Sequence, residues 1–115
     1  METKKMNAEQ LIGSALDWSV AKCEVVIKGD PLDIGFILEG GYSPSTQWEQ
    51  GGLIIDAEID ELIRYRVNPD TVMWSATARG DMECEADGPT ALIAAMRCYV
   101  KYKLGNEIDV PIEFA

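Results

Sequence analysis

The sequence contains no histidine among its 115 residues, and it has half as many basic residues as acidic ones. Histidine supplies the base in Ser–His and Cys–His catalysis and is the commonest metal ligand, so its absence excludes those chemistries. Ten Lys and Arg residues against twenty Asp and Glu residues give a formal net charge of −10. Because this charge repels phosphate groups, we expect no direct binding to nucleic acid or to an anionic membrane.

The cysteines form no metal-binding or disulfide pattern. Cys23, Cys84 and Cys98 are odd in number, and no Cys-x-x-Cys spacing occurs. We expect free thiols in a reducing cytoplasm, with neither a disulfide framework nor a zinc knuckle. The pair Gly51-Gly52 lacks the Lys-Ser/Thr that follows the glycine of a phosphate-binding loop, and we expect no cofactor.

Long apolar runs are missing as well. The longest, Ala91–Met96, is far too short to span a membrane, and Met1–Met6 is followed by polar residues instead of the apolar region of a signal peptide. The sequence therefore predicts a soluble cytoplasmic protein. Its hydrophobic content of 47% and charged content of 26% are typical of a globular chain. We expect a single domain over residues 1–115, with residues 1–6 disordered.

The first third of the chain predicts one helix and two strands. Apolar residues at helical spacing indicate a helix from about Ala8 to Glu24, capped by Asn7, with Gly13 as the alternative start. The β-branched run Val25–Ile27 and the apolar run Ile34–Leu38 each predict a short strand.

The irregular segment Tyr42–Gly52 contains a helix start signal. Thr46 is followed three residues later by Glu49, which is the pattern of a capping box. We expect a short helix that begins just after Thr46 and is interrupted at the glycine pair 51–52. Leu53–Ala57 then either resumes the helix or is extended.

Three strands and a helix follow. The strands are predicted at about Leu62–Val67, Val72–Arg79 and Met82–Ala86, as an antiparallel meander with one buried face. The helix has Pro89 in its first turn and ends at Gly105. The predicted fold class is α+β: a mostly antiparallel sheet of four to five strands, with the N- and C-terminal helices packed on it and a short helix after Thr46.

Alternation in the first strand of the meander separates apolar from basic residues. Ile63, Tyr65 and Val67 share one face, which we expect to be buried, and Arg64 and Arg66 share the other. The two arginines are candidate anion-pairing residues. Pairing with neighbouring Asp or Glu side chains is the other explanation.

Two further clusters contain residue types that are found in metal-binding or catalytic sites. Asp56, Glu58 and Asp60 alternate and, in an extended chain, would project from one face, where they could hold Mg²⁺ or Ca²⁺. No second segment supplies ligands, so we expect solvated charges and no metal site. The hydroxyls of residues 43, 45 and 46 have no lysine at the spacing of a catalytic base, and no catalytic residue is predicted.

The segment Tyr42–Gly52 is the candidate binding loop, because aromatic residues on an irregular, glycine-rich segment are typical of contact surfaces. Simple closure of the core is the other explanation for it. The candidate residues are Tyr42, Ser43, Ser45, Thr46, Trp48, Gly51 and Gly52.

Three blocks of sequence carry a resemblance to a known family. They are Gly13–Lys22, Tyr42–Ile55 and Gly88–Val100, the last followed by Leu104-Gly105. In this order they resemble the phage NinX-like family, small proteins encoded by temperate phages and prophages of Gram-negative bacteria. Gln47 stands where that family commonly has an acidic residue and Leu53 where it has proline. The resemblance, which extends to phage α-β-α sandwich domains, implies a sheet with helices against it and carries over no catalytic residues.

The expected function is that of a phage or prophage accessory protein in the cytoplasm of a bacterial host. We expect it to be non-catalytic and to act by binding a host or phage macromolecule, with a protein as the partner. Two alternatives stay open: a small-molecule or anion-binding domain that uses the Tyr42–Gly52 loop, and an acidic decoy of nucleic acid. Homodimerisation is also left open.

Overall fold

The computed structural model describes residues 2–28 and 41–115. Among these residues the five strands form two antiparallel sheets, and helices pack on them in an α+β fold, as predicted. The expected single sheet of four to five strands is divided into one sheet of two strands and one of three. In chain order the elements are β1 (Thr3–Asn7), the 3-10 helix η1 (Ala8–Gln10), α1 (Gly13–Lys28), α3 (Trp48–Glu58), β2 (Ile59–Asn68), β3 (Thr71–Ala78), β4 (Asp81–Gly88), α4 (Ala91–Leu104), β5 (Glu107–Pro111) and the 3-10 helix η2 (Ile112–Phe114).

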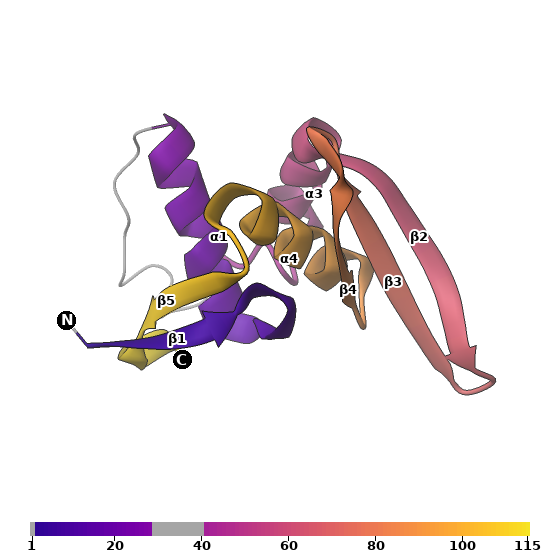
Figure 1. Ribbon diagram of the computed structural model, residues 1–115, viewed down its shortest axis with the longest axis horizontal. Helices are drawn as coiled ribbons and strands as arrows, with labels where there is room; N and C mark the ends of the chain where they lie inside the picture. The colour runs from indigo at the N-terminus through magenta and orange to yellow at the C-terminus, as the bar shows by residue number, and fades with distance from the viewer. Residues whose placement is uncertain (1, 29–40) are drawn as a thin grey trace.

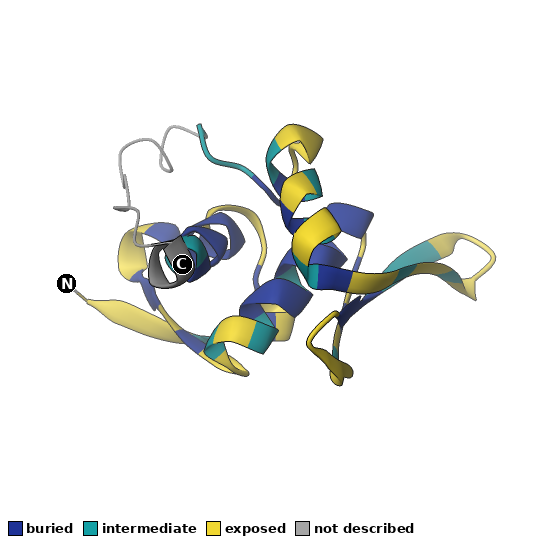
Figure 2. Ribbon diagram, turned by 90° about the horizontal axis from the view of Figure 1, so that it is seen from above, coloured by how far each residue is buried: buried dark blue, intermediate teal, exposed yellow. Residues whose placement is uncertain are grey.

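Helix α4 lies at the centre of the fold. It contacts α1 and α3 and packs along β3 and β4, and Figure 1 shows the two sheets on opposite sides of it. The hydroxyl of Thr90 caps its first turn by accepting a hydrogen bond from the Ile93 N–H at 3.1 Å. Its end at Gly105, where φ is +95°, is as predicted. Figure 2 shows buried residues along the helix, so α4 supplies the apolar surface on which the other elements close.

The two-stranded sheet joins the ends of the chain. Strand β1 pairs antiparallel with β5, with Thr3 opposite Pro111 and Asn7 opposite Glu107. The prediction that residues 1–6 are disordered is wrong for Thr3–Met6, because β5 offers their backbone a hydrogen-bonding partner from the far end of the sequence.

Helix α1 begins at Gly13, the alternative start given by the sequence, and ends later than predicted. Asn7 caps η1, where its side chain accepts a hydrogen bond from the Glu9 N–H, and α1 starts at Gly13 with φ +58°. The prediction of a strand at Val25–Ile27 is wrong, since these residues continue α1 to Lys28. Each residue added to an existing helix gains one backbone hydrogen bond, which outweighs the β propensity of a short run. The strand predicted at Ile34–Leu38 lies outside the described residues.

The meander β2-β3-β4 is confirmed, but the buried face of β2 is not the predicted one. Ile63 and Val67 are exposed, whereas Leu62 is opposite Ala76, which is opposite Ala86 on the side that α4 covers. Alternation alone cannot tell which face a helix will cover. The tip of the β2–β3 hairpin also extends beyond the helices in Figure 1.

No helix in the described part of the chain is long and apolar enough to cross a membrane. The prediction of free cysteines is confirmed: Cys23 and Cys98 are buried and Cys84 is partly exposed. Burial raises the pKa of the Cys23 and Cys98 thiols to about 12.

Candidate functional site

The segment before α3 folds back on itself in a turn. The N–H groups of Thr46 and Gln47 both donate to the Ser43 carbonyl, at 3.0 and 2.8 Å. The predicted capping box does not form, because the Thr46 hydroxyl also donates to that carbonyl, at 3.4 Å. Residue Gln47 occupies the cap position of α3 and makes no side-chain cap hydrogen bond.

Part of the predicted binding loop closes the core. Ser45 is buried, and its N–H donates at 3.0 Å to a carboxylate oxygen of Asp17, which is itself buried on α1. Burial raises the pKa of the Asp17 carboxyl, and the nearby backbone N–H and hydroxyl of Ser45 oppose this rise. The Ser45 hydroxyl is buried and makes no hydrogen bond of good geometry to any residue that the structure describes. Residue Ser45 is therefore an anchor for the loop and not part of an exposed surface.

The glycine pair does not interrupt α3, which runs without a break through residues 51 and 52. Gly51 is buried, and a Cβ at this position would overlap the Pro44 carbonyl oxygen and lie 2.7 Å from a methyl carbon of Leu92. A Cβ on Gly52 would lie 3.8 Å from the Trp48 ring, in ordinary contact. The first glycine is needed for close packing of α3 against the loop and α4, and the second is not.

Other residues of the segment face solvent. Trp48, at the start of α3, is 58% exposed, and Leu53 further along the helix is 73% exposed. Thr46 is also exposed, whereas Ser43 is half-buried and its N–H donates to the side-chain carbonyl oxygen of Gln50. The structure therefore divides the candidate loop: Ser45 and Gly51 close the core, and Trp48 belongs to the surface.

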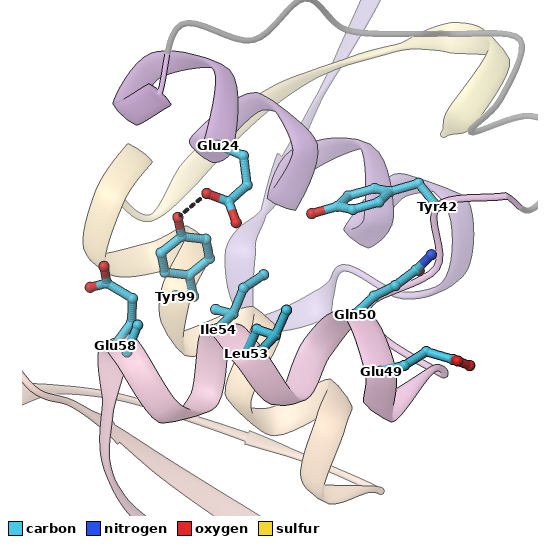
Figure 3. A pocket seen from close by; sticks show the side chains of 9 residues that line it. Glu24, Tyr42, Glu49, Gln50, Leu53, Ile54, Glu58 and Tyr99 are labelled. Carbon is cyan, nitrogen blue, oxygen red and sulfur yellow. Dashed lines mark hydrogen bonds between the residues drawn. The ribbon is translucent and has the colours of Figure 1, made fainter.

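A hollow of about 340 Å³ lies beside this surface, between α1, α3 and α4 (Figure 3). Three carboxylates line it, and none of the described residues that line it is basic. Figure 3 shows the Tyr42 hydroxyl directed towards Glu24, which accepts a hydrogen bond from the Tyr99 hydroxyl at 3.3 Å. The lining residues are Glu24, Tyr42, Glu49, Gln50, Leu53, Ile54, Ala57, Glu58 and Tyr99.

The polar groups that line the hollow are carboxylates, tyrosine hydroxyls and one amide. Burial, followed by the negative charge of Glu24, raises the pKa of the Tyr42 and Tyr99 hydroxyls above the ordinary value, so both stay protonated at neutral pH. Glu58 forms an ion pair with Lys103, with 3.6 Å between the Lys103 Nζ and a carboxylate oxygen. Protonated tyrosine hydroxyls beside carboxylates, over an apolar floor of Leu53 and Ile54, suit a cation with an apolar stem.

The predicted anion-pairing arginines are not in this hollow. Arg64 and Arg66 lie exposed on β2, and Arg66 donates to the Pro69 carbonyl at 3.2 Å in the hairpin turn. Among the described residues no ion pair joins either guanidinium to an Asp or Glu side chain, which was the expected alternative.

The acidic triplet is not one extended row. Asp56 and Glu58 lie on α3, and only Asp60 lies on β2, so the extended geometry that a metal site on these three residues would need is not present. No group of three potential metal-ligating side chains occurs within residues 2–28 and 41–115.

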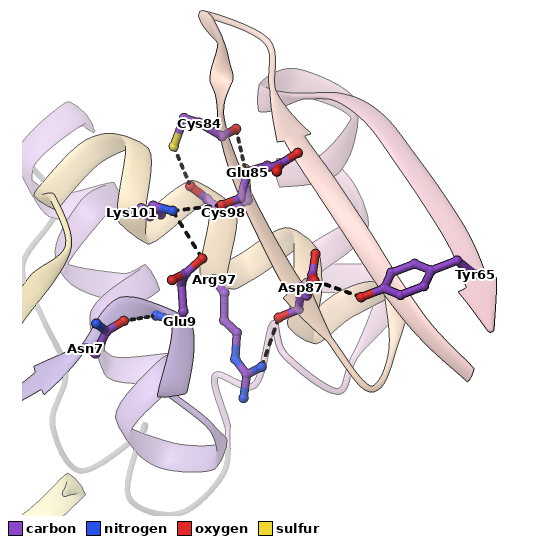
Figure 4. Close-up of polar contacts among 9 residues, drawn as sticks. All are labelled: Asn7, Glu9, Tyr65, Cys84, Glu85, Asp87, Arg97, Cys98 and Lys101. Atoms are coloured by element: carbon purple, nitrogen blue, oxygen red, sulfur yellow. Dashed lines mark hydrogen bonds and ion pairs between the residues drawn. The ribbon is translucent and has the colours of Figure 1, made fainter. Parts of the chain in front are cut away.

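A second polar cluster, shown in Figure 4, is structural. Arg97 on α4 donates to the Leu11 carbonyl at 2.8 Å and to the Asp87 carbonyl at 2.9 Å. The Tyr65 hydroxyl donates to the Asp87 carboxylate at 2.8 Å, and Lys101 forms an ion pair with Glu9 at 3.2 Å. These contacts tie η1 and the β2–β4 sheet to α4.

Sequence reasoning missed most of the hollow. Glu24 is the last residue of the first predicted helix, and Tyr99 lies within the last predicted helix. Neither position carries a local signal of a site, because α1, α3 and α4 bring these residues together only in the folded chain. Tyr42 was the one lining residue among the candidates.

Comparison with known protein families shows which family the chain belongs to. Residues 7–103, from the end of β1 to the last turn of α4, match the family described as Bacteriophage P22, NinX. The chain belongs to this family. A search of curated proteins finds no match. The NinX match includes α1, α3, the β2–β4 sheet and α4 up to residue 103, so every described residue that lines the hollow lies within it.

Proposed function

We propose that this NinX-family chain is a non-catalytic phage or prophage accessory protein that acts in the bacterial cytoplasm by binding a host or phage protein. The observation that carries the proposal is the surface of α3, where Trp48 and Leu53 are exposed next to the acidic hollow. Exposed tryptophan is enriched at positions that dominate binding energy. This surface consists of Trp48, Leu53 and the hollow, and we call it the α3 surface.

The chemistry of the α3 surface indicates the kind of partner segment. A lysine or arginine side chain would place its charge near Glu24 and Glu49 and could stack on the Tyr42 ring. Apolar neighbours of that side chain would cover Leu53 and Trp48. The partner we propose therefore presents a basic residue flanked by apolar ones.

The composition of the hollow supports binding over catalysis. Among its described lining residues there is no serine, cysteine, lysine or histidine that could form a nucleophile–base pair.

A small cationic molecule is the second candidate ligand, because a volume of about 340 Å³ falls within the range of small-ligand pockets. An anionic ligand is disfavoured, since three carboxylates line the hollow and none of its described lining residues is an arginine. The acidic-decoy alternative has less support. One row of exposed carboxylates does lie on β4, at Glu83, Glu85 and Asp87. The Asp87 carboxylate, however, already accepts a hydrogen bond from the Tyr65 hydroxyl.

The test is quantitative capture from lysate of phage-infected host cells, with the wild-type chain and with the variants Trp48→Ala and Leu53→Ala. We expect at least one protein that is retained by the wild type and about tenfold less by either variant. The control is Met82→Ala, which removes a side chain of similar exposure (57%) from β4 and should leave capture unchanged.

Equal loss in the control and the α3 variants would contradict the proposed location. Capture of no protein would contradict the macromolecular partner and favour the small cation instead.

A further inference from the structure

Cys84 on β4 and Cys98 on α4 contact each other where the three-stranded sheet meets the central helix (Figure 4). The Cys98 thiol donates to the Cys84 carbonyl at 3.5 Å, and the Cys84 thiol donates to the Cys98 carbonyl at 4.0 Å. Burial raises the pKa of the Cys98 thiol, and the neighbouring Cys84 raises it further. The two side chains therefore share one small space between sheet and helix.

The backbone around Cys84 departs from the regular ladder of the sheet. Asp81 and Glu85 are opposite consecutive residues of β3, so within the described strands residues 82–84 form a bulge without ladder partners. A disulfide requires Cα atoms about 4.4–6.8 Å apart and a specific torsion about the S–S bond. A bulge can make the small adjustment that this geometry needs without breaking ladder hydrogen bonds.

The two thiols differ in their access to solvent. Cys98 is fully buried, whereas Cys84 is partly exposed and lines a second hollow, of about 390 Å³, so an oxidant reaches Cys84 first. Burial raises the pKa of the Cys84 thiol, and the positive charge of Lys101 opposes this rise. With two carboxylates and one ammonium group among its described lining residues, this hollow admits a small uncharged oxidant better than an anionic one. Its lining residues are Asp81, Glu83, Cys84, Lys101, Tyr102 and Asn106.

We propose that Cys84 and Cys98 are an oxidation site that forms an intramolecular disulfide when the protein meets hydrogen peroxide. The Cys84 thiolate attacks one peroxide oxygen and the O–O bond breaks, which leaves a sulfenic acid on Cys84 and hydroxide, which takes up the thiol proton to give water. The Cys98 sulfur then attacks the Cys84 sulfur, the S–O bond breaks, and a second water leaves with the Cys98 proton. In total the two thiols lose two electrons and two protons, and one peroxide is reduced to two waters.

The disulfide joins β4 covalently to α4 and closes the loop between residues 84 and 98. Such a link reduces the conformational freedom of the unfolded chain, so the oxidised protein is the more stable form. Because burial disfavours both thiolates, the reduced pair has no charge stabilisation that would oppose the disulfide. The proposal rests on contacts between β4 and α4 and not on the α3 surface.

Peptide mass mapping of the full chain tests the site, after treatment with hydrogen peroxide and alkylation of the remaining thiols under denaturing conditions. We expect a monomer that has lost two hydrogens, with Cys84 linked to Cys98 and with Cys23 alkylated. A reducing dithiol should restore all three thiols. Cys23→Ser is the matched control, because Cys23 is buried on α1, and it should form the same disulfide.

Cys98→Ser keeps a group that can donate to the Cys84 carbonyl and removes the second sulfur. Sulfenic acid on Cys84 should persist in this variant and react with dimedone, whereas the wild type should give severalfold less adduct. The urea midpoint should rise on oxidation of the wild type and of Cys23→Ser, and not of Cys98→Ser. A wild-type chain whose Cys84 and Cys98 stay unlinked, a disulfide to Cys23 instead, or equal dimedone capture in wild type and Cys98→Ser would overturn the proposal.

Discussion

Gly51 lies at the point of closest approach between α3, the preceding turn and α4. A Cβ there would overlap the Pro44 carbonyl oxygen and press on Leu92, whereas Gly52 one position later has room for one. A side chain at position 51 would thus force its neighbours to move, whereas a side chain at position 52 would not.

We expect Gly51→Ala to lower the free energy of unfolding by about 1–3 kcal/mol, because overpacking forces neighbouring atoms to move. Gly52→Ala should raise it by up to about 1 kcal/mol, since alanine favours the helix over glycine. Urea denaturation of both variants measures the difference. Destabilisation of equal size in both would contradict the packing described for Gly51.

Asp17 holds the turn before α3 through its hydrogen bond from the Ser45 N–H, and burial raises its pKa above the ordinary value. A carboxyl whose pKa is higher in the folded than in the unfolded state binds its proton more tightly when folded. Its contribution to stability is therefore fully present below the unfolded pKa and is lost as pH rises through the folded pKa.

Asp17→Asn keeps an oxygen that can accept from the Ser45 N–H and removes the buried charge. We expect the stability of this variant relative to wild type to increase as pH rises from about 4 to about 7, with the largest gain at neutral pH. Asp17→Ala also removes the titrating carboxyl but leaves the Ser45 N–H without its acceptor, so it should be about 1–3 kcal/mol less stable than Asp17→Asn at every pH. Urea denaturation across this pH range is the measurement. An Asn variant whose relative stability does not change with pH would contradict the account.

At the scale of elements, α4 determines where everything else packs, and its ends are marked by local sequence. The Thr90 hydroxyl accepts a hydrogen bond from the Ile93 N–H, and Gly105 ends the helix with a positive φ. Such signals act within a few residues, so this helix could be predicted from the sequence.

Thr90→Ala removes the cap and should destabilise the protein by about 1 kcal/mol, as other cap deletions do. Thr90→Ser retains the hydroxyl and should lose much less. Thermal or urea denaturation compares the two variants, and similar losses in both would show that the methyl group of Thr90, not its hydroxyl, is what matters.

The elements that could not be predicted are those decided by distant residues. Strand β1 forms because β5, at the other end of the chain, pairs with it, and residues 25–28 stay helical because α1 is already formed. The meander was predictable from alternation and turns, but the buried face of β2 was not, since it depends on where α4 lies.

At the scale of the whole molecule, the α3 surface combines exposed apolar side chains with an acidic hollow. Within the candidate loop, sequence reasoning identified Tyr42 and Trp48. It could not place Glu24, Glu58 and Tyr99 beside Tyr42, because they come from different helices and carry no common motif.

The central claim is that a protein partner binds at the α3 surface, and hydrogen exchange of the captured complex tests it most directly. We expect the amides of α3 to exchange about tenfold more slowly in the complex, while those of β3 keep their free-state rates. Protection confined to the β2–β4 sheet, with α3 unchanged, would contradict the account.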